Sequence, residues 1–230
     1  MTYCFAPAPV RSLAIADSEQ RFPVNRIFCV GRNYAEHARE MGKDPEREAP
    51  FFFMKPAQAV LDCASPALMH YPPQTNNLHH EVELVVAIAT GGRDIAAADA
   101  LSHVFGYAVG LDMTRRDLQN TAKNAGRPWE FGKAFAQSAP MGVLHTVHSV
   151  GHIDNARIQL QVNASVRQDS NIDQLIWSVA ESIAQLSMFE ALEPGDLIMT
   201  GTPAGVAAVV PGDVMLAAID GLGAIEVQVA

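Results

Sequence analysis

Two glutamates stand where they could hold a metal ion together. Glu81 and Glu83 flank Val82 at the start of an apolar run that continues to Ile88. Side chains two residues apart on a strand share a face, with Cα atoms roughly 7 Å apart, and carboxylates that close need a counter-charge. A divalent cation supplies one. Taken alone, the pair is more typical of an edge strand with a solvated face, because exposed glutamates are common.

A third carboxylate favours the metal interpretation. Asp112 directly follows the apolar stretch 104–111, which is predicted to be a buried strand. A polar residue at the end of such a strand is a frequent site residue. Three carboxylates without a thiolate would form an all-oxygen site. Such a site favours Mg²⁺ or Mn²⁺, with Ca²⁺ as an alternative, over zinc.

Candidates for acid–base chemistry lie on either side of these strands. A short helix is predicted over 34–41, and His37 and Glu40 would share one face of it as a base and its orienting partner. Their spacing alone favours a solvated surface pair. Lys133 lies among aromatic residues and could point at the carboxylates or extend to solvent. His79 shares the strand parity of the glutamates, so it could face the site beside the ligands or serve as an alternative ligand. Because carboxylates are available, a supporting or structural role is expected first.

The elements that would position these residues are mostly strands. With 230 residues and 49% hydrophobic content, the chain is expected to form a single catalytic domain, 26–230, after an N-terminal arm, 1–25. Helices are predicted over 95–103, over 115–124 with Thr114 as its cap, and over 172–189 with Asn171 as its cap. Regular βαβ alternation is absent from the sequence, so a β-rich α+β fold is expected instead of a Rossmann fold.

Charge and cysteine usage limit the partners and the compartment. A net charge of −9 argues against nucleic-acid binding. The three cysteines are scattered without metal-finger spacing, which is typical of a reduced cytoplasmic protein. The N-terminus does not resemble a secretory signal, and no apolar run reaches the ~18 residues that a membrane helix needs. The predicted partner is therefore a small molecule.

Taken in order, these segments resemble the fumarylacetoacetate hydrolase family. The resemblance covers nearly the whole chain after residue 25, and the ordered set is far more specific than the two glutamates alone. Within the family, 51–53, 110–119 and 126–129 look most like bacterial members that hydrolyse fumarylpyruvate in the gentisate route of aromatic degradation. The matching segments are 26–34, 50–56, 79–86, 106–117, 132–133 and 199–203.

The resemblance implies a mixed β-roll, a homodimer and a set of roles for the candidate residues. Mg²⁺ or Mn²⁺ would be held by Glu81, Glu83 and Asp112, with water or substrate completing the shell. A short helix would order over the substrate and bring His37 and Glu40 to a water molecule. Catalytic and substrate contacts would come from Lys133, Arg116, Gln119 and Thr202.

The implied reaction is metal-dependent hydrolysis of the C–C bond of a 3-acylpyruvate, a 2,4-dioxo acid, with fumarylpyruvate giving fumarate and pyruvate. Oxaloacetate decarboxylation, general acylpyruvase activity and keto–enol isomerisation are alternatives. A metal-stabilised binding or scaffold protein is the alternative without turnover, although a structural ion needs neither His37 nor Lys133. For the distal carboxylate of the substrate, Arg32 and Arg127 are both candidates, and the sequence does not choose between them.

Overall fold

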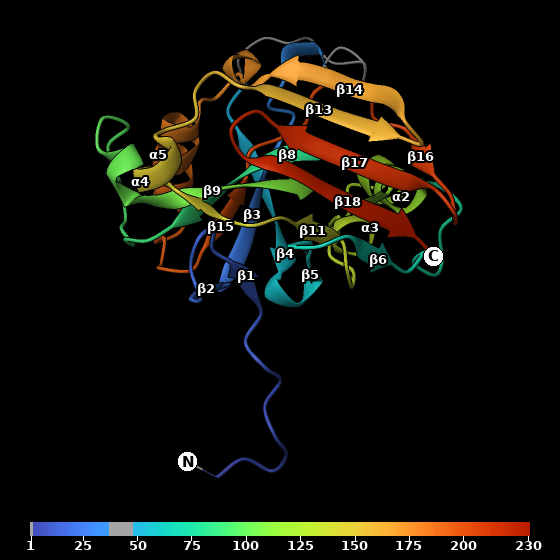
Figure 1. Ribbon diagram of the computed structural model, residues 1–230, viewed down its shortest axis with the longest axis horizontal. Coiled ribbons are helices and arrows are strands. Elements are labelled where there is room, and N and C mark those ends of the chain that lie inside the picture. Colours follow the sequence, from blue (N-terminus) through green and yellow to red (C-terminus); the bar gives the residue numbers. More distant parts are fainter. Residues whose placement is uncertain (1, 37–47) are drawn as a thin grey trace.

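Two packed β-sheets form the body of the protein (Figure 1). The computed structural model describes residues 2–36 and 48–230. In this part of the chain, the larger sheet has eight strands and the smaller has five. Along the larger sheet the order is β4 (Phe51–Pro56), β3 (Arg26–Gly31), β15 (Leu197–Met199), β8 (Val82–Ile88), β9 (Val104–Leu111), β11 (Ala139–Met141) and β5 (Val60–Asp62), with β12 (His145–Thr146) also paired to β9.

The smaller sheet lies across one face of the larger one. Its order is β14 (Ser165–Asn171), β13 (Arg157–Val162), β17 (Val214–Ile219), β18 (Gly223–Val229) and β6 (Ala67–Met69). Shorter pairings join β1 (Ser12–Ala14) to β2 (Arg21–Pro23), and β7 (Leu78–His79) to both β10 (Thr114–Arg115) and β16 (Ala208–Val209). The helices are α2 (Arg116–Asn124), α3 (Glu130–Lys133), α4 (Val147–Val150) and α5 (Val179–Phe189), and the short 3-10 helices are η1 (Ala57–Ala59), η2 (Ala100–His103) and η3 (Ile172–Gln174).

Strand β8 is covered on both faces. Leu84 and Val86 belong to the main core, which β13, β17 and β18 complete from the smaller sheet. Val85 and Ala87 face the opposite way, into a second core that contains Leu13 of β1. The predicted parity of this strand is therefore confirmed, whereas the interpretation as a solvated edge strand is wrong, because β8 lies between β15 and β9. The β-rich α+β fold class is confirmed as well.

The single helix predicted over 172–189 is wrong. The chain forms η3, then a short non-helical stretch with a bend at 176–177, and only then α5. Asn33 causes the interruption, because its carbonyl oxygen accepts from the Ile176 N–H at 2.8 Å and its side-chain oxygen accepts from the Trp177 N–H at 2.7 Å. Asn171 caps η3, while α5 starts at Ser178 with a reciprocal capping box to Glu181.

Two smaller expectations also fail. Only Ala100–His103 of the predicted helix 95–103 is helical, because the Ile95 N–H donates to the Ser187 hydroxyl of α5 at 2.8 Å. The helix predicted over 115–124 is confirmed as α2, but Thr114 does not cap it, since its hydroxyl donates to the Asp112 carbonyl at 3.1 Å.

The N-terminal residues fall into two parts. Leu13, Phe22 and Val24 are buried in the second core, whereas the segment before β1 extends away from the body (Figure 1). The domain boundary at residue 25 stays a prediction. Among the helices of the described residues, none has the length and apolar character to span a membrane.

Candidate metal centre and active site

The pairing of β8 with β9 brings three carboxylates together. Glu83 lies opposite Gly110, and the Asp112 N–H donates to the Glu81 carbonyl at 2.8 Å, just beyond the paired Val82 and Leu111. One carboxylate oxygen from each of Glu81, Glu83 and Asp112 lies within 4.8 Å of the others. All three side chains are buried. The predicted metal ligands thus form one compact cluster.

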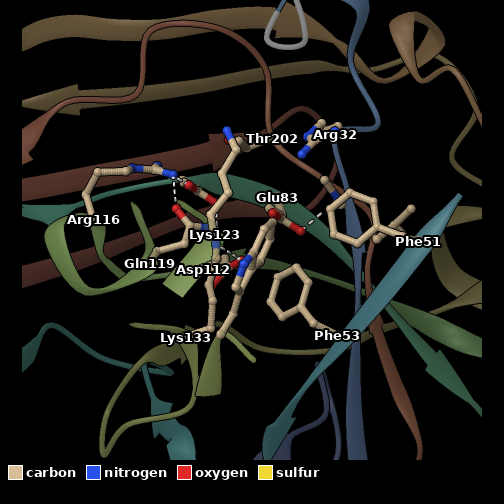
Figure 2. Close-up of a pocket in the computed structure, with 15 residues that line it drawn as sticks. Arg32, Phe51, Phe53, Glu83, Asp112, Arg116, Gln119, Lys123, Lys133 and Thr202 are labelled. Carbon is tan, nitrogen blue, oxygen red and sulfur yellow. Dashed lines mark hydrogen bonds and ion pairs between the residues drawn. The ribbon is translucent and has the colours of Figure 1, made fainter. Parts of the chain in front are cut away.

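Three cationic side chains surround this cluster, and Figure 2 shows two of them, Lys133 and Arg116. Lys133 Nζ lies 2.8 Å from Glu81 Oε2 and 2.6 Å from Asp112 Oδ2, and Lys55 Nζ lies 2.8 Å from Asp112 Oδ1. The guanidinium of Arg116 pairs with the other oxygen of Glu81. Burial by itself would lower the pKa of Lys133, but Asp112 and Glu81 outweigh it, and the pKa is raised. Lys133 is therefore a charged donor that points at the carboxylates, not a snorkelling surface lysine.

Glu83 is the least compensated of the carboxylates. Its Oε2 accepts the Gly201 N–H at 2.7 Å, but no lysine or arginine in the described ranges forms an ion pair with it. Burial, followed by repulsion from Asp112 and Glu81, raises the pKa of Glu83 well above its usual range. A hard divalent ion among these oxygens would offset this unfavourable charge, so the donor set fits Mg²⁺ or Mn²⁺.

Helix α2 supplies two of the predicted substrate contacts from one turn. Arg116 donates to the Gln119 side-chain oxygen at 2.6 Å, and both are buried at the pocket wall. Arg116 Nε also lies 3.4 Å from His79 Nδ1. Burial and then the charge of Arg116 lower the pKa of His79 to about 4. His79 is hence neutral near pH 7 and contacts the site through Arg116, as a neighbour and not as a ligand.

Thr202 enters the pocket from the loop after β15. Its hydroxyl oxygen accepts from Gln168 Nε2 at 2.8 Å, so its own proton is available to a ligand. Gln168 also donates to the Pro203 carbonyl at 2.8 Å, and its oxygen accepts from the Val82 N–H at 3.1 Å. This buried glutamine of β14 joins the smaller sheet to the start of β8 and to the loop that carries Thr202.

Aromatic side chains close one wall of the pocket. The Trp129 ring lies 5.4 Å from Phe51 and 5.9 Å from Phe53, between ring centroids. Lys133 Nζ lies 5.0 Å from the Phe53 ring. Phe51 and Phe53 therefore shape the site, although a run of three phenylalanines is most simply predicted to be core.

The sequence analysis did not predict Lys55 and Gln168 as residues of the site. Lys55 ends an apolar stretch and precedes a proline, which is only a weak local signal, and the sequence around Gln168 contains no such signal. His37 and Glu40 lie outside the described residues, so their acid–base role stays a prediction.

Comparisons with known proteins agree with this geometry. Residues 26–230 match the family described as fumarylacetoacetate (FAA) hydrolase C-terminal. A fumarylpyruvate hydrolase from Ralstonia sp is 43% identical over 186 residues, which is 81% of this chain and 95% of the relative. A mitochondrial oxaloacetate tautomerase from Rattus norvegicus is 41% identical over 203 residues, 88% of this chain and 90% of the relative.

A solved structure is similar over the full length. The crystal structure of fumarylpyruvate hydrolase from Pseudomonas aeruginosa in complex with Mn²⁺ and pyruvate is 57% identical, with a TM-score of 0.96, and the match covers 100% of this chain and 99% of that one. The chain therefore belongs to the fumarylacetoacetate hydrolase family.

Proposed function

We propose that this protein is a divalent-metal-dependent hydrolase that cleaves the C–C bond of a 3-acylpyruvate, with fumarylpyruvate giving fumarate and pyruvate. The observation that carries the proposal is the buried cluster of three carboxylates, with oxygens within 4.8 Å of one another, on the floor of a pocket lined by Arg116, Lys133 and Thr202. The similarity to two fumarylpyruvate hydrolases, one of them solved with Mn²⁺ and pyruvate, supports the same chemistry.

Glu81, Glu83 and Asp112 would hold one Mg²⁺ or Mn²⁺ ion. When bound, the ion would polarise the 2-oxo group of the substrate and stabilise the negative charge of the departing enolate. Arg116 and Gln119 are proposed to bind the pyruvate end of the 2,4-dioxo acid. Thr202 would donate its hydroxyl proton to a substrate oxygen, because its hydroxyl oxygen already accepts a hydrogen bond from Gln168.

Water activation is assigned to the part of the chain around residue 37. His37, oriented by Glu40, would remove a proton from a water molecule as the oxygen attacks the distal carbonyl of the substrate. The ammonium of Lys133 would stabilise the oxyanion, because its raised pKa keeps it a donor and not a base. The C–C bond then breaks, and the pyruvate enolate takes up a proton to give pyruvate.

The same pocket also suits oxaloacetate chemistry. The identity of 41% to an oxaloacetate tautomerase favours keto–enol isomerisation as a second candidate, and decarboxylation would pass through the same enolate. The assays separate these reactions by product: isomerisation releases no pyruvate, whereas decarboxylation releases CO₂.

A homodimer is proposed as the working assembly. Strand β4 ends the larger sheet with an outer edge that no described strand pairs with, and Met54 and Phe189 beside it are 46% and 71% exposed. A second copy would cover such an edge. The three free cysteines are compatible with the cytoplasm, where the gentisate route is the proposed setting.

The deciding experiment measures product formation with Mn²⁺ or Mg²⁺ on fumarylpyruvate, maleylpyruvate, acetylpyruvate and oxaloacetate in parallel. Fast formation of fumarate and pyruvate, abolished by EDTA and by His37→Ala, is expected. Activity on oxaloacetate alone would move the assignment to a decarboxylase or tautomerase. No turnover of any of the four, with metal bound, would leave a metal-binding protein without the proposed activity.

A further inference from the structure

Arg32 is a cation of the pocket wall that does not take part in the cluster of ion pairs. It directly follows β3 and lines the same pocket as the three carboxylates. In Figure 2 it lies on one side of Glu83, with Lys133 and Phe53 on the other. From this arrangement we infer that Arg32 binds the distal carboxylate of a dicarboxylate substrate, an inference that rests on the proposed function.

The position of Arg32 is set by its backbone and by one aromatic ring. Its φ of 55° lies in the left-handed region, and its guanidinium carbon lies 5.2 Å from the centre of the Phe51 ring. That ring occupies the space beside Gly31, where an added Cβ would meet it at 2.0 Å. A contact with a ring holds the guanidinium without neutralising it, so a bidentate pair with a carboxylate stays available.

The charges of the pocket call for a substrate with two carboxylates. Lys55, Lys133 and Arg116 form ion pairs with Glu81 and Asp112, and these three cations equal the three acidic side chains in number although none of them pairs with Glu83. Within the described ranges, no aspartate or glutamate forms an ion pair with Arg32. A divalent ion would add two further positive charges. Together with Arg32, the excess would be three positive charges. A dianionic acylpyruvate would offset two of them, whereas acetylpyruvate, with one carboxylate, would offset one.

Arg127, the other candidate from the sequence, lines an adjoining groove. That groove shares Phe51, Phe53, Trp129 and Lys133 with the pocket but contains none of the three acidic side chains. The two arginines thus differ in location and not in chemistry, and Arg127 serves as a matched control.

The test compares Arg32→Met, Arg32→Lys and Arg127→Met with the unchanged Mn²⁺-loaded protein on fumarylpyruvate and acetylpyruvate. Arg32→Met is expected to lower kcat/KM for fumarylpyruvate by about 10- to 100-fold, the usual effect of losing a charge-assisted pair. For acetylpyruvate the expected loss is less than about threefold, because that substrate has no distal carboxylate. Arg32→Lys should lower kcat/KM for fumarylpyruvate less than Arg32→Met does, since lysine keeps the positive charge but not the two-pronged hydrogen bonding of a guanidinium. Arg127→Met should leave kcat/KM unchanged for both substrates.

The outcomes separate this inference from the proposed function. Equal losses on both substrates, or no loss on fumarylpyruvate, would overturn the role of Arg32 and leave the hydrolase intact. If the unchanged protein turns over neither substrate, the proposed function fails, and calorimetric binding of the same two compounds decides the inference. If Arg32→Met then binds fumarylpyruvate as tightly as the unchanged protein does, the role of Arg32 is overturned. If the variant binds fumarylpyruvate at least about tenfold more weakly and acetylpyruvate equally well, the role is upheld.

Discussion

Lys55 and Asp112 form a buried ion pair, with Lys55 Nζ 2.8 Å from Asp112 Oδ1 and side chains 0% and 1% exposed. The same ammonium donates to the Met113 carbonyl at 3.2 Å, to the Ser138 hydroxyl at 3.0 Å and to the Lys133 carbonyl. Lys55 comes from β4 and therefore fastens this outer strand to the metal cluster at the end of β9. It fixes both the carboxylate of Asp112, a proposed metal ligand, and the backbone of Lys133, the proposed oxyanion donor.

Replacing Lys55 with methionine should destabilise the metal-free protein strongly. The substitution keeps roughly the length of the side chain but leaves one oxygen of Asp112 without its ion pair and removes the donor to the Met113 carbonyl and the Ser138 hydroxyl. The Lys133 carbonyl would keep only the hydrogen bond that it accepts from Ser138 at 2.9 Å. Breaking a buried pair by removing one partner costs about 3–5 kcal/mol. Urea unfolding of the unchanged protein and of Lys55→Met measures the difference directly.

An exposed ion pair on the same molecule provides the control. Arg21 pairs with Asp62, and their side chains are 45% and 36% exposed. Arg21→Met should cost only about 0–1 kcal/mol, because solvent screens such pairs. If Lys55→Met and Arg21→Met lose equal free energies of unfolding, the burial of Lys55 does not determine how much it stabilises the protein.

Glu83 should make the metal-free protein less stable as the pH rises. Its pKa in the folded state is raised, so the folded protein binds the proton more tightly than the unfolded chain does. The stability that this provides is complete below the usual pKa of glutamate, about 4.3, and is lost as the pH rises through the folded pKa. Bound Mn²⁺ should reverse the effect, since it needs the ionised form.

Glu83→Gln isolates this contribution, because the other titrating groups are common to both proteins. Without metal, the free energy of unfolding of the variant should equal that of the unchanged protein near pH 4 and exceed it by a growing margin toward pH 8. The Mn²⁺ affinity of the variant should fall by at least about tenfold. Unfolding curves at several pH values, with EDTA or Mn²⁺, give both numbers. A margin that stays constant with pH would refute the assignment of the shift to Glu83.

Local pattern identified the three carboxylates but did not show that they meet. Alternation predicted one face for Glu81 and Glu83, and the position after an apolar strand marked Asp112 as a candidate. Their joint metal site was implied by the resemblance to the family, and the pairing of β8 with β9 is what brings them together. Lys55 could not be found this way, because its partner lies 57 residues later and only the sheet order brings them together.

The failed helix over 172–189 has a similar cause. Its apolar residues recur at helical spacing, but Asn33, distant in sequence, holds Ile176 and Trp177 in a bend between η3 and α5. A tertiary hydrogen bond of this kind overrides local periodicity and leaves no trace in the segment itself. The capping box of Ser178 and Glu181 was the available local signal for where the helix begins.

The cysteines should differ sharply in reactivity. Cys4 is exposed, whereas Cys29 and Cys63 are buried. Burial raises the pKa of Cys29 well above its usual range and that of Cys63 to about 12, so neither forms appreciable thiolate at pH 8. A thiol-disulfide reagent should react rapidly with one group per native chain and with three in denaturant. Rapid native reaction of two or more groups would contradict the burial.

Gln168 should couple the smaller sheet to the substrate pocket. Its amide forms four hydrogen bonds, to His80, Val82, Thr202 and Pro203, and Gln168→Leu leaves these buried groups unpaired. Each unpaired buried group costs about 1–3 kcal/mol, so urea unfolding should show a loss of at least about 2 kcal/mol. Because Thr202 also loses the donor that orients its hydroxyl, KM should rise about tenfold with a smaller change in kcat.

Gln228 of β18, a strand of the same sheet, supplies the comparison, since its side chain is exposed and makes no hydrogen bond to the described residues. Gln228→Leu should leave stability within about 0.5 kcal/mol and leave KM unchanged. The split between KM and kcat is decisive here. A purely structural glutamine would lower stability without moving KM in the fraction that stays folded, whereas one that orients Thr202 must move KM even at temperatures where the variant is fully folded.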